Sequence, residues 1–340
     1  KELPVTKKDL DILLNAATSL TASNSRETVY KALYIAQATD GTDVDAVLAE
    51  YTTQTPMQED IRANILRRVI GGRRSAAVVP TLIAFVNSNP KPDSAAAALE
   101  AIRAVADETH FKDLLGILEF SNDGNIRKRC EEGVVAIIKK SSNRSALSDS
   151  IEPAYSAATL PEVKHALLRC LGATGSPKAK EILVSTLKGQ DKLAQIAAAD
   201  ASKNWPDDSM FEEMMEILEE TTDETVRPRM FHSSREFLLM ESKRDEMDAE
   251  ELWRMLAKNA KTDEEQEAVI RALANNPADW AMVVVEYFQD KAESDRVIDL
   301  AGKALDRMRA KARLTNKDDD EEEEEEDEEK AEDEETKEEE

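Results

Sequence analysis

The feature that most constrains the fold of this chain is a recurring pair of amphipathic helical stripes separated by helix breakers. Apolar residues within 111–118 fall at i, i+3, i+4 and i+7, which places them on one face of a helix. Residues 121–125 break this pattern, and a second apolar stripe follows over residues 126–137. The two stripes predict a helix–turn–helix unit.

The same unit recurs along most of the chain. The second helices are expected to begin near Val29, Ile61, Ala95, Ile126, Val163, Lys192, Val226, Gln266 and Arg296. Successive starts are 29 to 40 residues apart. A helix pair of this length cannot bury its apolar face alone, so neighbouring pairs must stack. The spacing therefore predicts an all-α solenoid of about eight helix pairs.

Composition favours helices over strands. Aromatic residues make up 4% of the chain, and there are only 10 glycines among its 340 residues. β-Sandwiches use β-branched and aromatic residues with many glycine-containing turns, whereas Ala- and Leu-rich stripes suit closely packed helices. Residues that typically start and end helices lie where the apolar stripes begin and end. Ser176 and Pro177 predict the start of a helix, and Gly189 predicts its end.

Several segments resemble HEAT repeats. Residues 168–183 (LRCLGATGSPKAKEIL) are similar to the phycobilisome-lyase subtype, and residues 77–83 (AVVPTLI) are similar to a HEAT first helix. Second helices of the family often begin with Asp, an apolar residue and Arg, as in Asp60-Ile61-Arg62. The resemblance covers most of residues 5–314. It implies a right-handed α-α superhelix of the HEAT/armadillo type, in which the second helices line the concave surface.

The sequence predicts two regions with different properties. Residues 1–314 are expected to form the helical repeats, with an irregular N-terminal cap at 1–55 and a C-terminal cap at 294–314. Residues 315–340 carry no apolar stripe, and the stretch 317–340 holds 19 acids and three lysines, a net charge of −16. Like charges repel one another and bury no surface, so a disordered acidic tail is expected. The rest of the chain then carries a net charge of −10.

No catalytic residue, metal or cofactor is expected. Cys130 and Cys170 lie within apolar stripes, which predicts buried small hydrophobes rather than reactive thiols. His110, His165 and His232 are scattered along the chain. HEAT-repeat hydroxylases that bind di-iron carry repeated His-Glu pairs, and the sequence contains none. A HExxH motif is also absent.

The other motifs of catalysis are missing as well. There is no glycine-rich phosphate loop, and the glycine pair at 71–72 is interpreted as a turn between helices. Phycobilisome-lyase activity is not carried over, because the resemblance lies in structural repeat positions. We therefore expect that the chain is not an enzyme.

Charge predicts a binding surface on the second helices. If these helices line a concave face, as the resemblance implies, that face is less acidic than the convex one. It would then hold an acidic protein segment or the chain's own acidic tail. Alternatively, basic residues near helix C-termini simply complement the helix dipole. The candidate partner-binding residues are Arg62, Arg67, Arg127, Lys128, Arg129, Lys164, Arg227 and Arg229.

The expected function is a scaffold that binds a partner protein. One alternative is an acidic-tailed chaperone or transport adaptor for basic cargo. Another is a DNA-repair enzyme on a HEAT-like scaffold, which would need a strongly basic concave face. A net charge of −26 argues against nucleic acid as the partner.

The compartment of the protein stays open. No apolar run approaches the roughly 18 residues of a membrane span, so membrane insertion is not expected. The chain begins at Lys1 rather than Met, as expected of a processed or truncated chain. The segment NWPD at 204–207 resembles degenerate HEAT arrays of exported bacterial proteins, which implies an exported protein.

Overall fold

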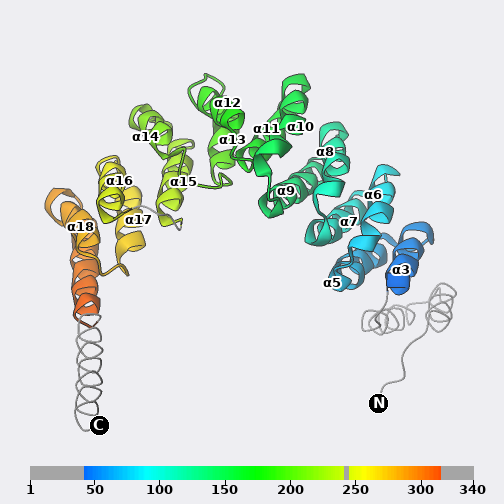
Figure 1. Ribbon diagram of the computed structural model, residues 1–340, viewed down its shortest axis with the longest axis horizontal. Coiled ribbons are helices and arrows are strands. Elements are labelled where there is room, and N and C mark those ends of the chain that lie inside the picture. Colours follow the sequence, from blue (N-terminus) through cyan, green and yellow to red (C-terminus); the bar gives the residue numbers. More distant parts are fainter. Residues whose placement is uncertain (1–41, 241–244, 315–340) are drawn as a thin grey trace, which may run out of the picture. The chain divides into compact units, whose positions relative to one another are not determined.

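The structure is a computed structural model that describes residues 42–240 and 245–314. Every regular element in these ranges is a helix (Figure 1). The all-α prediction is therefore confirmed. The chain divides into two compact units, residues 1–206 and residues 207–340. The predicted tail at 315–340 and most of the predicted N-terminal cap lie outside the described residues.

The first unit is built from antiparallel helix pairs. The first helices are α3 (Thr42–Gln54), α6 (Val79–Asn87), α8 (Phe111–Phe120), α10 (Arg144–Ala157) and α12 (Pro177–Leu187). The second helices are the continuous segment 59–73, α7 (Pro92–Val105), α9 (Gly124–Lys140), α11 (Pro161–Gly172) and α13 (Lys192–Ser202). Short 3₁₀ turns, η2 (Ala76–Val78) and η3 (Glu108–His110), precede α6 and α8.

The second unit repeats the arrangement. Its first helices are α14 (Phe211–Glu220), α16 (Glu246–Lys258) and α18 (Asp279–Lys291). Its second helices are α15 (Arg227–Leu239), α17 (Asp263–Leu273) and a helix over residues 295–314. That last helix buries Val297, Ala301 and Leu305 on one face, and charged residues occupy the other. Its assignment as a C-terminal cap stays a prediction.

Helix boundaries follow the punctuation in the sequence. The hydroxyl of Ser176 accepts a hydrogen bond of 3.0 Å from the Ala179 N–H, and α12 begins at Pro177, as predicted. The carboxylate of Asp123 accepts hydrogen bonds from the N–H groups of Asn125 and Ile126 at the start of α9. These caps satisfy N–H groups that lack an intrahelical acceptor.

The glycine pair at 71–72 corrects an expectation. It does not form a turn between helices, because it lies inside the helix that runs from α4 (Glu59–Asn64) through the π-helical stretch η1 (Ile65–Ile70) to α5 (Gly71–Arg73). The helix ends at Arg74, whose φ of 51° is left-handed. A Cβ at Gly71 would lie 3.7 Å from the Cβ of Ala101 in α7, an ordinary contact distance, so packing at this position does not require glycine.

Small residues let the second helices of the first unit pack closely on one another. Residues 95–98 of α7 are four consecutive buried alanines, and α13 buries Ala197, Ala198 and Ala199. Helices with small side chains at the contact can approach more closely than helices with large ones. Among the described residues, no helix is long and apolar enough to cross a membrane.

Candidate functional site

Three of the predicted partner-binding arginines join the two helices of their own repeat. Arg62 and Arg127 lie four residues after the residue that precedes their helix, and Arg227 lies four residues after Asp223. Each donates to the carbonyl of the residue that follows the preceding first helix. Arg62 Nη2 donates to the Thr55 carbonyl at 2.9 Å, and Arg127 Nη1 donates to the Ser121 carbonyl at 3.0 Å. Arg227 does the same at Thr221. We call this contact the turn clamp.

The turn clamp recurs with other donors. Gln195 Nε2 donates to the carbonyls of Leu187 and Gly189, and Gln266 Nε2 donates to the Ala260 carbonyl. Carbonyls in the last turn of a helix lack intrahelical partners, so a side-chain donor here stabilises both the helix end and the turn. An Arg or Gln at this position therefore stabilises the helix pair, independently of any partner.

Lys164 occupies the equivalent place in α11 but makes a different contact. Its ammonium lies 5.0 Å from the centroid of the Tyr155 ring in α10. This is a cation–π distance. Arg62 adds a similar contact, with its guanidinium 5.6 Å from the centroid of the Phe85 ring.

Arg227 is the clearest correction to the predicted surface. Only 6% of this residue is exposed, so it cannot contribute to a partner-binding face. Its Nε lies 2.9 Å from Oε1 of the equally buried Glu265. Arg229 is half-buried, and its Nη1 donates to the Thr225 carbonyl at 2.6 Å. Both arginines thus bind groups within the second unit.

Arg67 and Arg129 belong to a row of ion pairs across neighbouring second helices, which we call the charge ladder. Arg67 Nε lies 2.8 Å from Glu100 Oε2, and Arg129 Nη2 lies 3.0 Å from Glu100 Oε1. Arg103 and Arg129 both bind Glu132, at 2.9 and 3.1 Å. The paired residues lie at similar distances from the first residues of α7 and α9, and residues further along α7 pair with residues further along α9, so these helices run parallel.

The charge ladder continues into α11. Arg169 donates two hydrogen bonds to Glu131, with Nε to Oε1 at 2.7 Å and Nη2 to Oε2 at 2.8 Å. Burial lowers the pKa of Arg169, but the hydrogen bonds and negative charge of Glu131 outweigh it and leave the pKa above its usual value. This two-point geometry fixes the orientation of α11 against α9.

The second-helix face of the first unit is therefore mixed in charge. The balance of charges within each second helix did not predict the ion pairs between helices, although Glu100 and Glu131 recur 31 residues apart, close to the repeat interval. Lys128 is exposed, as are Arg67 and Lys164 among the eight candidates, and it lines an opening of about 400 Å³ between α9 and α11.

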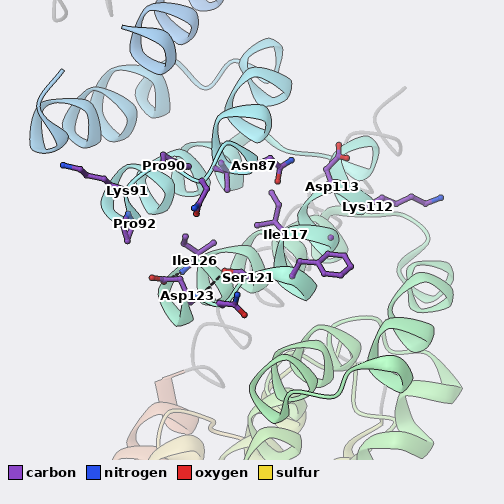
Figure 2. Close-up of a pocket in the computed structure, with 15 residues that line it drawn as sticks. Asn87, Pro90, Lys91, Pro92, Lys112, Asp113, Ile117, Ser121, Asp123 and Ile126 are labelled. Carbon is purple, nitrogen blue, oxygen red and sulfur yellow. Dashed lines mark hydrogen bonds between the residues drawn. The ribbon is translucent and has the colours of Figure 1, made fainter. Parts of the chain in front are cut away.

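A larger cleft lies between the turn that joins α6 to α7 and the turn that joins α8 to α9 (Figure 2). Its volume is about 750 Å³. Val86 and Ile117 contribute apolar surface from α6 and α8, and Ile126 does so from α9. The cleft forms between two repeats rather than within one, so the sequence pattern of a single repeat does not predict it.

The rim of the cleft is polar. Lys91 and Lys112 lie at its edge with Asp113 and Asp123 (Figure 2). Both lysines and Asp113 are exposed. Gly116 lies in the wall, and a Cβ added there would meet no atom within 4 Å. Phe120 also lines the cleft, with 83% of its surface exposed.

Both cysteines are buried, as predicted. Cys130 and Cys170 are each 0% exposed. Burial raises the pKa of Cys130 to about 12, and burial, with a smaller contribution from Glu131, raises that of Cys170 well above its usual value. Burial also lowers the pKa of His165. Within the two described ranges, no group of three or more His, Cys, Asp or Glu side chains is arranged to hold a metal ion.

We expect the two thiols to be inert in the folded protein. Treatment of the full chain with iodoacetamide at pH 8 should label neither cysteine, whereas both should be labelled in denaturant, as read by mass spectrometry. The native state keeps the Cys130 proton that the unfolded chain releases, so this thiol lowers stability as pH rises from about 9 to about 12. Rapid labelling of the native chain would contradict the buried assignment.

Comparison with solved structures shows a limited similarity. No protein-family model and no curated protein sequence matches the chain. The structure of human deoxyhypusine hydroxylase in complex with glycerol is similar with a TM-score of 0.34 and 12% sequence identity. The match covers 88% of this chain and 96% of the hydroxylase. At this TM-score, the likeness supports no argument about the fold or the activity of the chain.

This comparison corrects one expectation. We expected that the chain is not an enzyme, but the similar structure belongs to a hydroxylase. The expectation that the chain is not an enzyme is withdrawn. The likeness assigns no reaction, substrate or metal to this chain.

Proposed function

We propose that the chain is a scaffold that holds a partner protein on the exposed face of the second helices of its first unit. The observation that carries this proposal is the charge ladder. Its outer members stay accessible, since the side chains of Arg67 and Arg103 are 41% and 50% exposed and that of Glu100 is 28% exposed. A repeated surface of paired charges is complementary to a partner with the opposite arrangement of charges.

The charge ladder favours protein over nucleic acid as the partner. Phosphate backbones are bound by clustered cations that release counterions, and here each arginine of the row is neutralised by a carboxylate. The finer resemblance to the phycobilisome-lyase subtype describes repeat positions and adds no partner to the proposal. Binding of basic cargo by the acidic tail is the alternative role, and it predicts dependence on residues 315–340 rather than on the charge ladder.

The test is reversal of one exposed ladder charge. Arg103→Glu sets a carboxylate against Glu132 and should reduce the amount of partner captured from lysate by about tenfold, the effect of losing one close interfacial charge pair. The matched control is Arg254→Glu in α16. Arg254 is also exposed and paired, lying 2.6 Å from Glu250. Capture is measured by quantitative mass spectrometry on the full chain.

Three outcomes separate the proposals. Loss of partners with Arg103→Glu but not with Arg254→Glu supports the scaffold. Equal retention by both variants, with loss on deletion of residues 315–340, would instead favour the acidic-tailed adaptor. Titration with duplex DNA at low salt should give no binding, and a salt-dependent complex with DNA would overturn the choice of a protein partner.

A further inference from the structure

The cleft between α6–α7 and α8–α9 has the size and lining of a site for an apolar side chain. Its volume of about 750 Å³ falls within the range of about 300–1,000 Å³ that is typical of ligand pockets. Ile117 and Ile126 are half-buried, so each keeps apolar surface toward the opening. Gly116 leaves the wall between them without a side chain.

Exposed apolar residues recur at the turns of three consecutive repeats. Phe120 ends α8, Leu160 precedes α11, and Leu193 is in the first turn of α13. They are 83%, 48% and 65% exposed. The ion pairs of the charge ladder show that α7, α9 and α11 run parallel. Gly172 at the end of α11 approaches Ala201 near the end of α13, so α13 also runs parallel to α11, and the turns that precede these four helices share one edge of the first unit. Regular recurrence along one edge suits a segment that spans several repeats.

Charge at the cleft favours an acidic segment. The carboxylate of Asp123 is committed to capping α9. Lys91 and Lys112 are exposed and form no ion pair within the described part of the chain, and Asp113 is the one other acid of the lining. The cleft thus holds two available ammonium groups against one available carboxylate, although the whole chain carries 71 acids and 45 bases. The amides of Asn87, Asn89 and Asn122 are exposed beside them.

We propose that this cleft binds a large apolar side chain from an acidic segment of the partner protein, and that the segment continues along the edge marked by Phe120, Leu160 and Leu193. A second copy of this chain is a poor occupant, because two chains of net charge −26 repel each other. The chain's own residues 315–340 contain one apolar residue, Ala331, and supply no large anchor. The inference rests on the proposed function and names the partner's chemistry.

The probe is a phage-displayed library of random 16-residue peptides selected on the full chain. The expected result is enrichment of peptides with Leu, Ile, Met or Phe flanked by Asp or Glu. A synthetic copy of the most enriched peptide, labelled with fluorescein, then gives affinities by fluorescence anisotropy. Enrichment of basic peptides, or no enrichment, would overturn the proposal.

Two variants test whether the cleft is the site. Gly116→Leu adds an apolar side chain to the wall of the cleft at a position where a Cβ meets no atom within 4 Å. Leucine is the better helix former, so the thermal midpoint should not fall. The peptide should bind at least tenfold more weakly, as expected when an apolar side chain loses its burial. Phe120→Ser should also weaken binding. Met247→Ser, which removes another apolar side chain that is 78% exposed, should not.

The remaining outcomes assign a failure to its source. If Gly116→Leu binds the peptide as the wild type does while Arg103→Glu loses it, the cleft proposal is wrong and the scaffold stands. If neither the library nor lysate yields a ligand, the scaffold itself fails. If Phe120→Ser changes the mass of the free chain in analytical ultracentrifugation, the edge joins copies of this chain, and the acidic partner segment is rejected.

Discussion

Replacing Arg227 by methionine should lower the free energy of unfolding of the second unit by about 3–5 kcal/mol, the usual cost of leaving one member of a buried ion pair alone. Both Arg227 and Glu265 are buried, at 6% and 5% exposure. The substitution leaves the Glu265 carboxylate with the Lys261 N–H as its remaining hydrogen-bond donor. An uncompensated buried charge is far more costly than a lost surface contact.

Arg227 also holds three helices together, which adds to the loss. Its Nη1 donates to the Leu218 carbonyl of α14 at 2.6 Å and to the Thr221 carbonyl at 3.1 Å. Its Nη2 donates to the Asn259 carbonyl at the end of α16. Methionine fills similar volume but donates no hydrogen bond, so each of these carbonyls loses the guanidinium as a donor.

The measurement is urea denaturation combined with hydrogen exchange of peptides from residues 207–314, which reports opening of this unit alone. The control is Arg271→Met in α17. Arg271 is 68% exposed and pairs with Glu267 at 2.8 Å, so this change should cost less than about 1 kcal/mol. Equal effects of the two substitutions would show that the Arg227–Glu265 pair does not stabilise the unit as argued.

Replacing Gly172 by alanine should cost the first unit about 2–3 kcal/mol, at the upper end of the usual overpacking range. A Cβ at this position would lie 2.3 Å from the Ala201 carbonyl oxygen and 2.8 Å from its carbon. Because the obstacle is backbone rather than a flexible side chain, α11 and α13 must separate. That separation exposes neighbouring apolar surface, which outweighs the better helix propensity of alanine.

The same substitution one helix pair earlier has the opposite expected sign. Gly116→Ala in α8 meets no atom within 4 Å, so it should raise the free energy of unfolding by about 0.5–1 kcal/mol. Thermal unfolding of both alanine variants, followed by circular dichroism, makes the comparison. If both variants shift the midpoint in the same direction, close approach of α11 and α13 is not what requires glycine at position 172.

Local sequence patterns were sufficient to predict most helix positions. The second helix predicted near Lys192 begins at that residue, and the predicted cap at Ser176 is formed. Apolar periodicity and capping depend on residues within about four positions of one another, so one sequence carries the full signal. Gly71-Gly72 was wrongly assigned to a turn, because glycines are typical of turns but the helix over 59–73 continues through this pair.

The character of the candidate surface was less predictable. Arg127 and Arg227 occupy equivalent positions after Asp123 and Asp223, yet the first is half-buried and the second is almost fully buried. Arg227 is buried against Glu265, which lies 38 residues later in the sequence. The residues close to Arg227 in the sequence therefore do not reveal this pairing. The cleft beside Gly116 was likewise outside sequence reasoning, because residues from four helices and two turns enclose it.

The sequence by itself determined that this chain forms stacked helix pairs, because helical periodicity, caps and breakers are local properties of the polypeptide. The tertiary structure decided which charges remain available and where a partner could enter. Charge pairing and cleft formation depend on residues brought together from neighbouring repeats, and a net charge or a stripe of basic residues does not specify those distances. The charge ladder forms only when neighbouring helix pairs stack. The surface predicted to be basic is therefore one of paired opposite charges, and a separate cleft lies at its edge.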